Sequence, residues 1–424
     1  MLSGQFLRCL NINSGDKEMN IMGFLDFAIY WSIVIMPFSV AISPGMANAF
    51  IGFFIVFFII KKALTRKPFS TDRLTLIFFF LFSLFSVISI INSVSYSASF
   101  QGIVKLLKYL LIFLVCSEET RDKKHITRII VSICFGISLM SIDALWQMVS
   151  GFDFVHHIAI QSAIGLPRPT ASFPNCNILG IYLSALTPFI FGLGCFYSKG
   201  RSKLFMFIVS VLGLIGVCLT LSRGAGLGVY LAILFLSIAM KKKSLILFLV
   251  GILVVFPFVV PKNIKQWAKE VNYNPLVLMC NQDRISIYSN TINMIKHHPF
   301  IGVGVNTFSK NYGKYKTEQA EKYAPTPDGI YAHNSYLQMG GEIGLLGLLA
   351  FILFLFQVFR QSFRLERKSD DKYLKIIAIS LVASIVAYLV NSLTETSLYY
   401  PRVVMIFWYL IGVSLSLNRL AKES

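Results

Sequence analysis

The chain has 424 residues, of which 55% are apolar and only 14% are charged, and its formal net charge is +19. A soluble domain carries about 25% charged residues, so the composition excludes a soluble globular protein and predicts an all-α polytopic integral membrane protein. The basic residues form no recognisable nucleic-acid-binding module, so we expect no nucleic acid among the partners.

Apolar runs of about 17 to 25 residues predict roughly twelve transmembrane helices, because a helix of that length crosses the hydrocarbon core of a bilayer. The run at 102–116 is the weakest, since Lys105 and Lys108 stand in it one helical turn apart and predict a polar face turned away from lipid. We expect spans near residues 24–42, 46–60, 74–91, 102–116, 129–149, 175–197, 204–221, 224–240, 244–260, 336–359, 376–393 and 402–418.

The loops between these runs alternate in charge, which predicts the orientation of the chain. Short loops at 43–45, 92–101 and 394–401 contain no Lys or Arg and should face the periplasm or cell exterior. Both termini should then lie inside. The loops crowded with Lys and Arg, which should face the cytoplasm, are 61–73, 117–128, 198–203, 241–243 and 360–375.

We expect four parts along the chain. They are a cytoplasmic N-terminal tail at 1–23, a bundle of about nine spans at 24–260 with an external loop at 150–174, an external lid at 261–335, and C-terminal spans with a short tail at 336–424. Prolines in the external loop exclude a helix there and predict a loop packed over the bundle. Cys176 and Cys280 could meet outside, although separate buried thiols are the simpler interpretation.

One helix is predicted inside the lid, over residues 283–297. Ile285, Tyr288, Ile292 and Ile295 recur at helical spacing and predict its apolar face, Asp283 can cap its start, and Pro299 ends it. Arg284 then lies in the first turn, where backbone amides and the helix dipole favour an anion. The alternative is a surface arginine paired with Asp283 or another acid.

A second arginine stands in the hairpin between the spans at 204–221 and 224–240. Arg223 is flanked closely by apolar residues, so its charge needs a partner. Gly224 and Gly228 would let another helix or a ligand come close. The alternative is an arginine whose side chain reaches external water or headgroups.

A histidine stands at the start of the tenth apolar run. His333 is a proton acceptor at the mouth of a span, in a chain that otherwise keeps ionisable groups out of its spans, and is therefore a candidate functional residue. Alternatively, it caps the helix that begins beside it. Arginine suits bidentate phosphate binding, so we expect a lipid-linked diphosphate at the external arginines, which are Arg168, Arg223, Arg284 and Arg402.

Taken together, these runs resemble the O-antigen ligase and O-antigen polymerase superfamily. The resemblance rests on the Ser222-Arg223-Gly224 hairpin, the Arg284 helix leading into residues 299–308, and the run His333-Asn334-Ser335-Tyr336-Leu337-Gln338 to Glu342-Ile343-Gly344. Residues 168–177 are similar to a further family element. These motifs are specific in combination and weak individually.

The resemblance implies an O-antigen ligase, a glycosyltransferase of the bacterial inner membrane whose active site faces the periplasm. The donor would be a glycan linked to undecaprenyl diphosphate, the acceptor a sugar hydroxyl of lipid A-core, and the surroundings membrane lipids. Such enzymes work without nucleotide sugar, ATP, metal or other cofactor.

The residue chemistry fits such a transfer. His333 could accept the proton of the attacking hydroxyl, and Arg223 and Arg284 could stabilise the leaving diphosphate, with inversion at the anomeric carbon. We expect Arg168, Asn334, Gln338 and Glu342 to bind substrate. Glu342 could instead orient His333, and Arg168 could brace its loop against Glu342 or Glu395.

Other functions stay open at this point. A lipid or solute transporter would need ionisable groups or broken helices near the bilayer midplane, whereas the charges here gather at one face. An O-antigen polymerase shares the donor and the catalytic residues, and a protein O-glycan ligase differs only in its acceptor. We favour the ligase because one dominant external loop stands late in the chain.

Overall fold

Each of the twelve predicted spans falls on a helix of the computed structural model, which describes residues 14–163, 165–260, 262–317 and 330–423. Ten helices are long and apolar enough to cross a membrane, and α10 passes the same test only together with its bent continuation α11. The remaining one, α9, is a shorter apolar helix. The all-α membrane fold is thus confirmed. The helices on which the twelve predicted spans fall are α2 (Ser14–Ile42), α3 (Pro44–Thr65), α4 (Arg73–Ile88), α5 (Tyr96–Glu119), α6 (Lys123–Ser150), α7 (Cys176–Phe196), α8 (Gly200–Leu219), α9 (Arg223–Ala239), α10 (Lys243–Val259), α16 (Ser335–Lys368), α17 (Lys372–Asn391) and α18 (Pro401–Glu423).

Several helices continue beyond the apolar runs that predicted them. α2 begins at Ser14, so residues 14–23 of the predicted tail are helical, whereas residues 1–13 lie outside the described part. α16 runs on to Lys368, which leaves only residues 369–371 of the predicted loop 360–375 before α17. The reason is physical: Arg, Lys, Glu and Gln are good helix formers, so hydropathy marks where the lipid ends and not where the helix ends.

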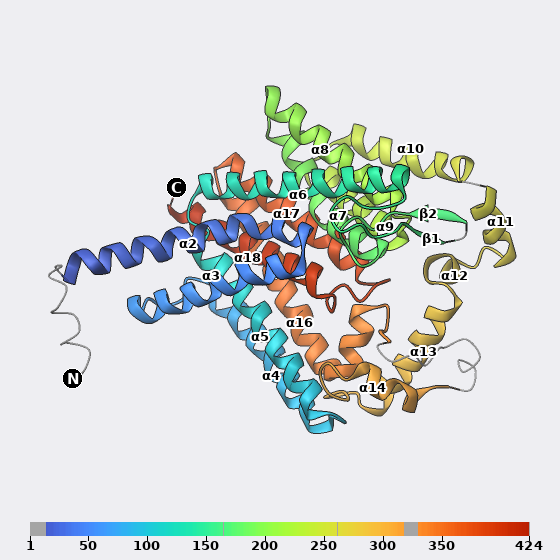
Figure 1. Ribbon diagram of the computed structural model, residues 1–424, viewed down its shortest axis with the longest axis horizontal. Helices are drawn as coiled ribbons and strands as arrows, with labels where there is room; N and C mark the ends of the chain where they lie inside the picture. Colours follow the sequence, from blue (N-terminus) through green and yellow to red (C-terminus); the bar gives the residue numbers. More distant parts are fainter. Residues whose placement is uncertain (1–13, 164, 261, 318–329, 424) are drawn as a thin grey trace.

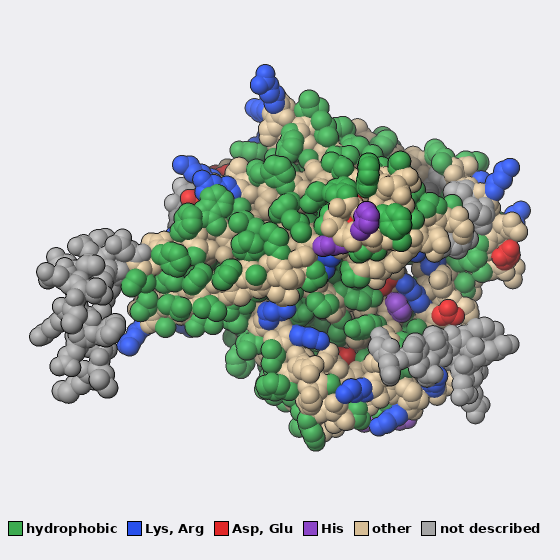
Figure 2. Space-filling model, viewed as in Figure 1, with side chains coloured by type: hydrophobic (Ala, Val, Ile, Leu, Met, Phe, Trp, Pro, Cys, Tyr) green, Lys and Arg blue, Asp and Glu red, His purple; other side chains and the backbone are tan. Residues whose placement is uncertain are grey.

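The core of the bundle is made by α7, α17 and α18, which lie in the middle of the molecule in Figure 1. Around them the outward faces of the helices are apolar, with Phe80 73% and Leu247 70% exposed. Figure 2 shows hydrophobic side chains covering the surface over α2, α3 and α6. An apolar surface on this scale is expected where a protein meets lipid and not water.

The loop between α6 and α7 packs over one end of the bundle, as predicted, and it carries a small antiparallel hairpin of β1 (Gln161–Ala163) and β2 (Leu166–Arg168) that the sequence did not predict. Gln147 on α6 accepts hydrogen bonds from the amides of Thr170 and Ala171. Arg402 is 5% exposed and donates to the carbonyl oxygens of Val40, Ala41 and Ser172. The expectation that Arg402 belongs to the external phosphate cluster is therefore wrong, because the backbone of this loop and of α2 already occupies its donors.

At the same end as that hairpin lies the lid, here residues 262–317 and 330–334. It contains α11 (Lys262–Glu270), α12 (Pro275–Cys280), α13 (Gln282–His297), α14 (Phe308–Tyr312) and a 3-10 turn, η3 (Gly313–Tyr315). In Figure 1 these elements lie on the right, away from the end of α18. We call this the lid end of the bundle.

The helix predicted at 283–297 is present as α13, but its buried face differs from the predicted one. Ile292 is 43% exposed, and the buried residues are Ser286, Ile287, Asn290, Thr291 and Met294. A Cβ on Gly341 of α16 would lie 3.1 Å from the sulfur of Met294, so α13 packs on a thin, glycine-lined part of α16. Ile295 of the predicted face also reaches α16, because a Cβ on Gly340 would lie 3.1 Å from its Cδ1.

α16 is kinked at Gly344, which has a φ of 76°. A Cβ there would lie 2.1 Å from the carbonyl oxygen of Phe300, so only glycine allows the lid to approach the kink. The amides of Val303 and Gly304 donate to the carbonyl oxygens of Gly341 and Glu342. The predicted turn at residues 302–304 thereby fastens the lid to α16.

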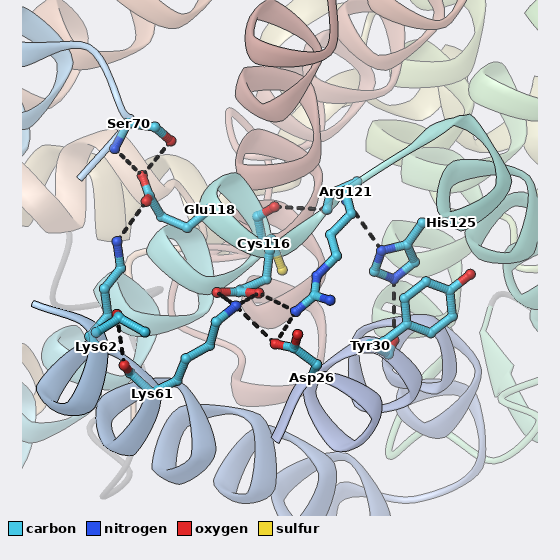
Figure 3. Close-up of polar contacts among 12 residues, drawn as sticks. Asp26, Tyr30, Lys61, Lys62, Ser70, Cys116, Glu118, Arg121 and His125 are labelled. Carbon is cyan, nitrogen blue, oxygen red and sulfur yellow. Dashed lines mark hydrogen bonds and ion pairs between the residues drawn. The ribbon is translucent and has the colours of Figure 1, made fainter. Parts of the chain in front are cut away.

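The opposite end of the bundle carries a network of ion pairs (Figure 3). Lys61 contacts Glu119 at 2.6 Å, Lys62 contacts Glu118 at 2.9 Å, and Arg121 contacts Asp26 and Glu119. The network ties α2, α3 and α5 together. Part of the basic charge that predicted the orientation is therefore neutralised within the fold.

Candidate functional site

A pocket opens at the lid end where the turn between α8 and α9, the start of α13, and the turn between α17 and α18 come together. Its empty volume is about 400 Å³, open solvent included. Three of the predicted residues, Arg168, Arg223 and Arg284, line it together with Glu395. The remaining lining residues are Asn177, Leu221, Ser222, Gly224, Met279, Asn281 and Thr394.

Arg223 is the first residue of α9. Its guanidinium donates to the carbonyl oxygen of Leu278 and, at 2.6 Å, to Oδ1 of Asn281, and it lies 5.6 Å from the ring centre of Trp267 on α11. A Cβ on Gly224 would lie 2.0 Å from Oγ1 of Thr394, so the glycine lets α9 meet the turn after α17. The prediction that glycine allows a close approach here is confirmed.

Arg284 lies in the first turn of α13, as predicted, and is largely buried. It donates to the carbonyl oxygen of Thr394 and to Oε1 of Glu395, both at 2.5 Å. Burial would lower the pKa of Arg284, but the carboxylate of Glu395 outweighs it and raises that pKa. Asp283 neither caps the helix nor pairs with Arg284. The cap position belongs to Asn281, whose side chain binds Arg223 instead.

Arg168 ends the β-hairpin and lines the pocket from the side of α7. Its Nε donates to the carbonyl oxygen of Thr220 and its Nη2 to Oδ1 of Asn177, each at 2.8 Å. Asn177 in turn donates to Oε1 of Glu395 at 2.7 Å. Arg168 therefore braces its loop, but it does so through Asn177 and not by direct contact with Glu342 or Glu395.

Glu395 connects the whole site. The only role predicted for it was as a brace for Arg168. Oε1 accepts from Asn177 and Arg284, while Oε2 lies 3.3 Å from Nδ1 of His333 and 3.4 Å from the hydroxyl of Tyr400. Burial would raise the pKa of Glu395, but the hydrogen bond from His333 and the charge of Arg284 outweigh it and hold the pKa below its usual value. The signal that could have identified Glu395 is its position as an acidic residue in the predicted external loop 394–401, which contains no Lys or Arg.

His333 stands just before α16 in a left-handed backbone conformation, with φ at 48°. Few residues other than glycine adopt this conformation, although histidine, asparagine and aspartate do so more often than the rest, and such positions gather at functional sites. Because an ionised carboxylate can only accept a hydrogen bond, Nδ1 carries the proton and Nε2 is left as an acceptor. The imidazole is 31% exposed, so a substrate can reach it.

The residues that follow His333 hold this segment in place. Asn334, not His333, caps α16, since its Oδ1 accepts from the amides of Tyr336 and Leu337 at 3.0 Å. Gln338 accepts from the amide of Ala332 at 3.1 Å. The interpretation that His333 caps the helix is therefore wrong.

Glu342 is buried one turn beyond Gln338 and does not contact His333. It accepts from the amides of Asn306 and Phe308 and from Gln338. The interpretation that Glu342 orients His333 is wrong, because Glu395 has that position and Glu342 binds the backbone of the lid. Neither Asn334, Gln338 nor Glu342 lines the pocket, and substrate binding by them stays a prediction.

Two further expectations concern cysteine and charge. Cys176 and Cys280 are both buried and free, which confirms the interpretation as separate thiols. The pocket gathers three guanidinium groups and one carboxylate. An excess of positive charge remains there, so the site favours an anion that can accept several hydrogen bonds.

Comparison with known proteins matches the part of the chain that contains Arg223, Arg284 and His333, but not Arg168 or Glu395. Residues 208–352 match the family described as O-Antigen ligase. An "O-antigen polymerase" of Salmonella muenchen is 25% identical over 279 residues, covering 61% of this chain and 65% of the relative. A "Teichuronic acid biosynthesis protein TuaE" of Bacillus subtilis (strain 168) is 23% identical over 317 residues, covering 67% of this chain and 62% of the relative. The chain thus spans slightly less than two thirds of the length of these relatives.

Proposed function

We propose that the chain is a membrane glycosyltransferase of polysaccharide assembly, as a member of the O-antigen ligase and polymerase superfamily to which it is similar. Its donor is a glycan on undecaprenyl diphosphate, and its acceptor is a sugar hydroxyl of lipid A-core. The observation that carries the proposal is the position of Glu395, which joins Arg284 to His333 at the edge of an arginine-lined pocket.

The pocket suits the diphosphate of such a donor. Arg223 and Arg168 contact backbone carbonyl and amide oxygens but no carboxylate among the described residues, so their charges are available to phosphate. As the bond between the anomeric carbon and the diphosphate breaks, negative charge grows on the leaving oxygen. Arg223 and Arg284 stabilise that charge, which is the part a divalent metal plays in other transferases.

His333 acts as the general base. The acceptor hydroxyl oxygen attacks the anomeric carbon, its proton passes to Nε2 of His333, and the polyprenyl diphosphate leaves on the opposite side of the sugar. The configuration at the anomeric carbon is therefore inverted. Glu395 holds Nδ1 protonated and stabilises the imidazolium that forms, as a carboxylate behind a catalytic histidine does elsewhere.

The orientation follows from charge. The lid end faces the periplasm of a bacterial inner membrane, and the ion-paired end with its basic loops faces the cytoplasm. A long polyprenyl chain can then stay in the bilayer while its diphosphate reaches the pocket near the membrane edge.

A second candidate is supported by one relative. That protein is named as an O-antigen polymerase, and a polymerase would join lipid-linked repeat units with the same base and arginines. The single large lid late in the chain favours the ligase. A protein O-glycan ligase would differ only in the acceptor.

Deletion of the gene in the bacterium that carries it, followed by gel analysis of lipopolysaccharide, tests the proposal. Loss of a ligase leaves bare core while long lipid-linked chains accumulate, and loss of a polymerase leaves core bearing one repeat unit. Lipopolysaccharide of unchanged length distribution would refute both.

A further inference from the structure

Two lysines of α5 have no acidic partner in the part of the chain that the structure describes. Nζ of Lys105 lies 3.3 Å from Oδ1 of Asn306 on the lid, and Nζ of Lys108 lies 3.3 Å from Oδ1 of Asn48 on α3. An amide oxygen accepts a hydrogen bond but does not neutralise a charge. Because a lysine within a membrane-spanning helix is costly, two that form no ion pair among the described residues indicate a functional site whose partner is an anion.

These lysines lie where the lid meets the bundle. A Cβ on Gly102, one turn before Lys105, would lie 2.8 Å from Cβ of Asn306, so the lid rests directly on the outer part of α5. Lys310 on α14 donates to Ser95 just ahead of the same helix. Figure 2 shows basic side chains over α5 and over α14 on this face. An anion bound by Lys105 and Lys108 would therefore lie at the lid end, on the same side as the catalytic pocket.

Hydrogen bonds connect Lys105 to the segment of His333. Oδ1 of Asn306 accepts a hydrogen bond from Lys105, and the backbone amide of Asn306 donates one to Glu342. Gln338 contacts Glu342 in turn. Gln338 accepts from Ala332, the residue next to His333. The buried hydrogen bonds of Glu342 therefore join Lys105 to the residue next to His333, although Glu342 itself does not line the pocket.

Aromatic side chains border the same route. Tyr331, two residues before His333, is 39% exposed. The Tyr331 ring lies 5.8 Å from the ring of Tyr400, whose hydroxyl contacts Glu395. Exposed tyrosine rings offer a flat apolar face with a polar edge, which suits a sugar ring.

We propose that Lys105 and Lys108 form a subsite for a phosphate group on the acceptor saccharide, with Tyr331 supporting a sugar between that group and His333. The proposal rests on the proposed function and specifies its acceptor as anionic. Lysine serves here as a point charge for phosphate, separate from the arginines, which take the diphosphate of the donor.

Purified protein in nanodiscs, with lipid-linked donor and deacylated core oligosaccharide as acceptor, tests this subsite. The oligosaccharide is supplied either intact or dephosphorylated. The variants are Lys105→Gln, Lys108→Gln and the double variant, with Lys296→Gln as the control for an exposed lysine of the lid. Equilibrium binding of both oligosaccharides is measured without donor, and initial rates are measured with it.

We expect the double variant to bind intact oligosaccharide about tenfold or more weakly, since each charge-assisted contact is worth roughly one such factor. The acceptor KM should rise while kcat and the donor KM stay near wild type. Dephosphorylated oligosaccharide should bind wild type and double variant equally weakly.

Equal loss for both oligosaccharides, or no loss for either, would overturn the subsite. A loss seen only in nanodiscs with anionic lipid would assign the lysines to a lipid headgroup and overturn it as well. Wild-type protein that binds the intact oligosaccharide through Lys105 and Lys108 but transfers nothing to it would refute the ligase function and leave the subsite standing.

Discussion

Nδ1 of His333 lies 3.3 Å from Oε2 of Glu395, a residue 62 positions later in the chain. The other oxygen of the same carboxylate is held by Arg284 at 2.5 Å. One acidic side chain thus positions both the proposed base and one of the proposed phosphate ligands. A donor diphosphate that binds Arg284 would compete with Glu395, so donor binding and the state of His333 are physically coupled.

Replacing His333 with alanine should abolish transfer while the protein still accumulates in the membrane. General-base catalysis contributes about 10²–10⁴ in rate, and the imidazole is partly exposed, so its removal should disturb packing little. The measurement is glycan transfer in membranes with matched protein levels. His297→Ala, at an exposed position near the end of α13, is the control. Near-normal activity of His333→Ala would show that His333 is not the general base.

Arg223→Lys should be severe although the charge is kept. The guanidinium donates to two separate acceptors, Leu278 and Asn281, and a lysine cannot reproduce that fork. We expect a fall of about 10² in kcat, comparable to the loss of one donor to a developing anion. Arg201→Lys, at an exposed position near the start of α8, should leave activity unchanged. Full activity of Arg223→Lys would reduce Arg223 to a membrane anchor.

The charge of Glu395 can be tested through the pH dependence of stability. Its pKa is lower in the folded protein than the ordinary value of about 4.3. The ionised carboxylate therefore stabilises the fold above that ordinary value, and the contribution is lost as the pH falls through the lowered pKa. Thermal unfolding should show the full difference in stability between wild type and Glu395→Gln at pH 7. That difference should disappear in acid.

For the same experiment, Asp283→Asn is the matched control, since Asp283 is exposed in the first turn of α13 beside Arg284. Its unfolding curve should follow that of wild type. A Glu395→Gln difference that stayed constant or grew towards low pH would contradict the assigned charge state.

The packing of α9 on α17 predicts opposite outcomes for two neighbouring glycines. A Cβ at Gly228 would lie 2.6 Å from the carbonyl oxygen of Ala387, whereas a Cβ at Gly226 would meet nothing within 4 Å. Gly228→Ala should destabilise the protein by about 1–3 kcal/mol, the usual effect of overpacking. Gly226→Ala should be neutral or stabilising, because alanine favours a helix interior over glycine. Equal thermal midpoints for the two variants would show that α9 is not packed in this way.

Much of the fold could be predicted because the signal is local. A long run of apolar side chains can cross lipid wherever it occurs, so each of the twelve predicted spans falls on a helix, and ten helices of the described residues are long and apolar enough to cross a membrane. Arg223, Arg284 and His333 were also found, since ionisable residues stand out beside apolar runs. The ends of α2 and α16 were missed because polar helix formers extend a helix beyond the lipid.

Contacts between distant segments could not be predicted in this way. The buried face of α13 is set by Gly341 on α16, and no pattern within α13 reveals that partner. Arg402 has the composition of a phosphate ligand, yet the carbonyl oxygens of α2 and of the loop before α7 occupy it. The role of Arg402 depended on which backbone carbonyl oxygens the fold brought within reach of its guanidinium group.

The sequence by itself determined that this protein is a helical membrane protein with basic and imidazole groups at one end, because burial of apolar side chains in lipid is decided residue by residue. Only the tertiary structure decided that Glu395, and not Glu342, serves His333 and Arg284. Hydrogen bonds and ion pairs act over a few ångströms in space, and the residues that meet there come from α7, α13, the start of α16 and the turn before α18.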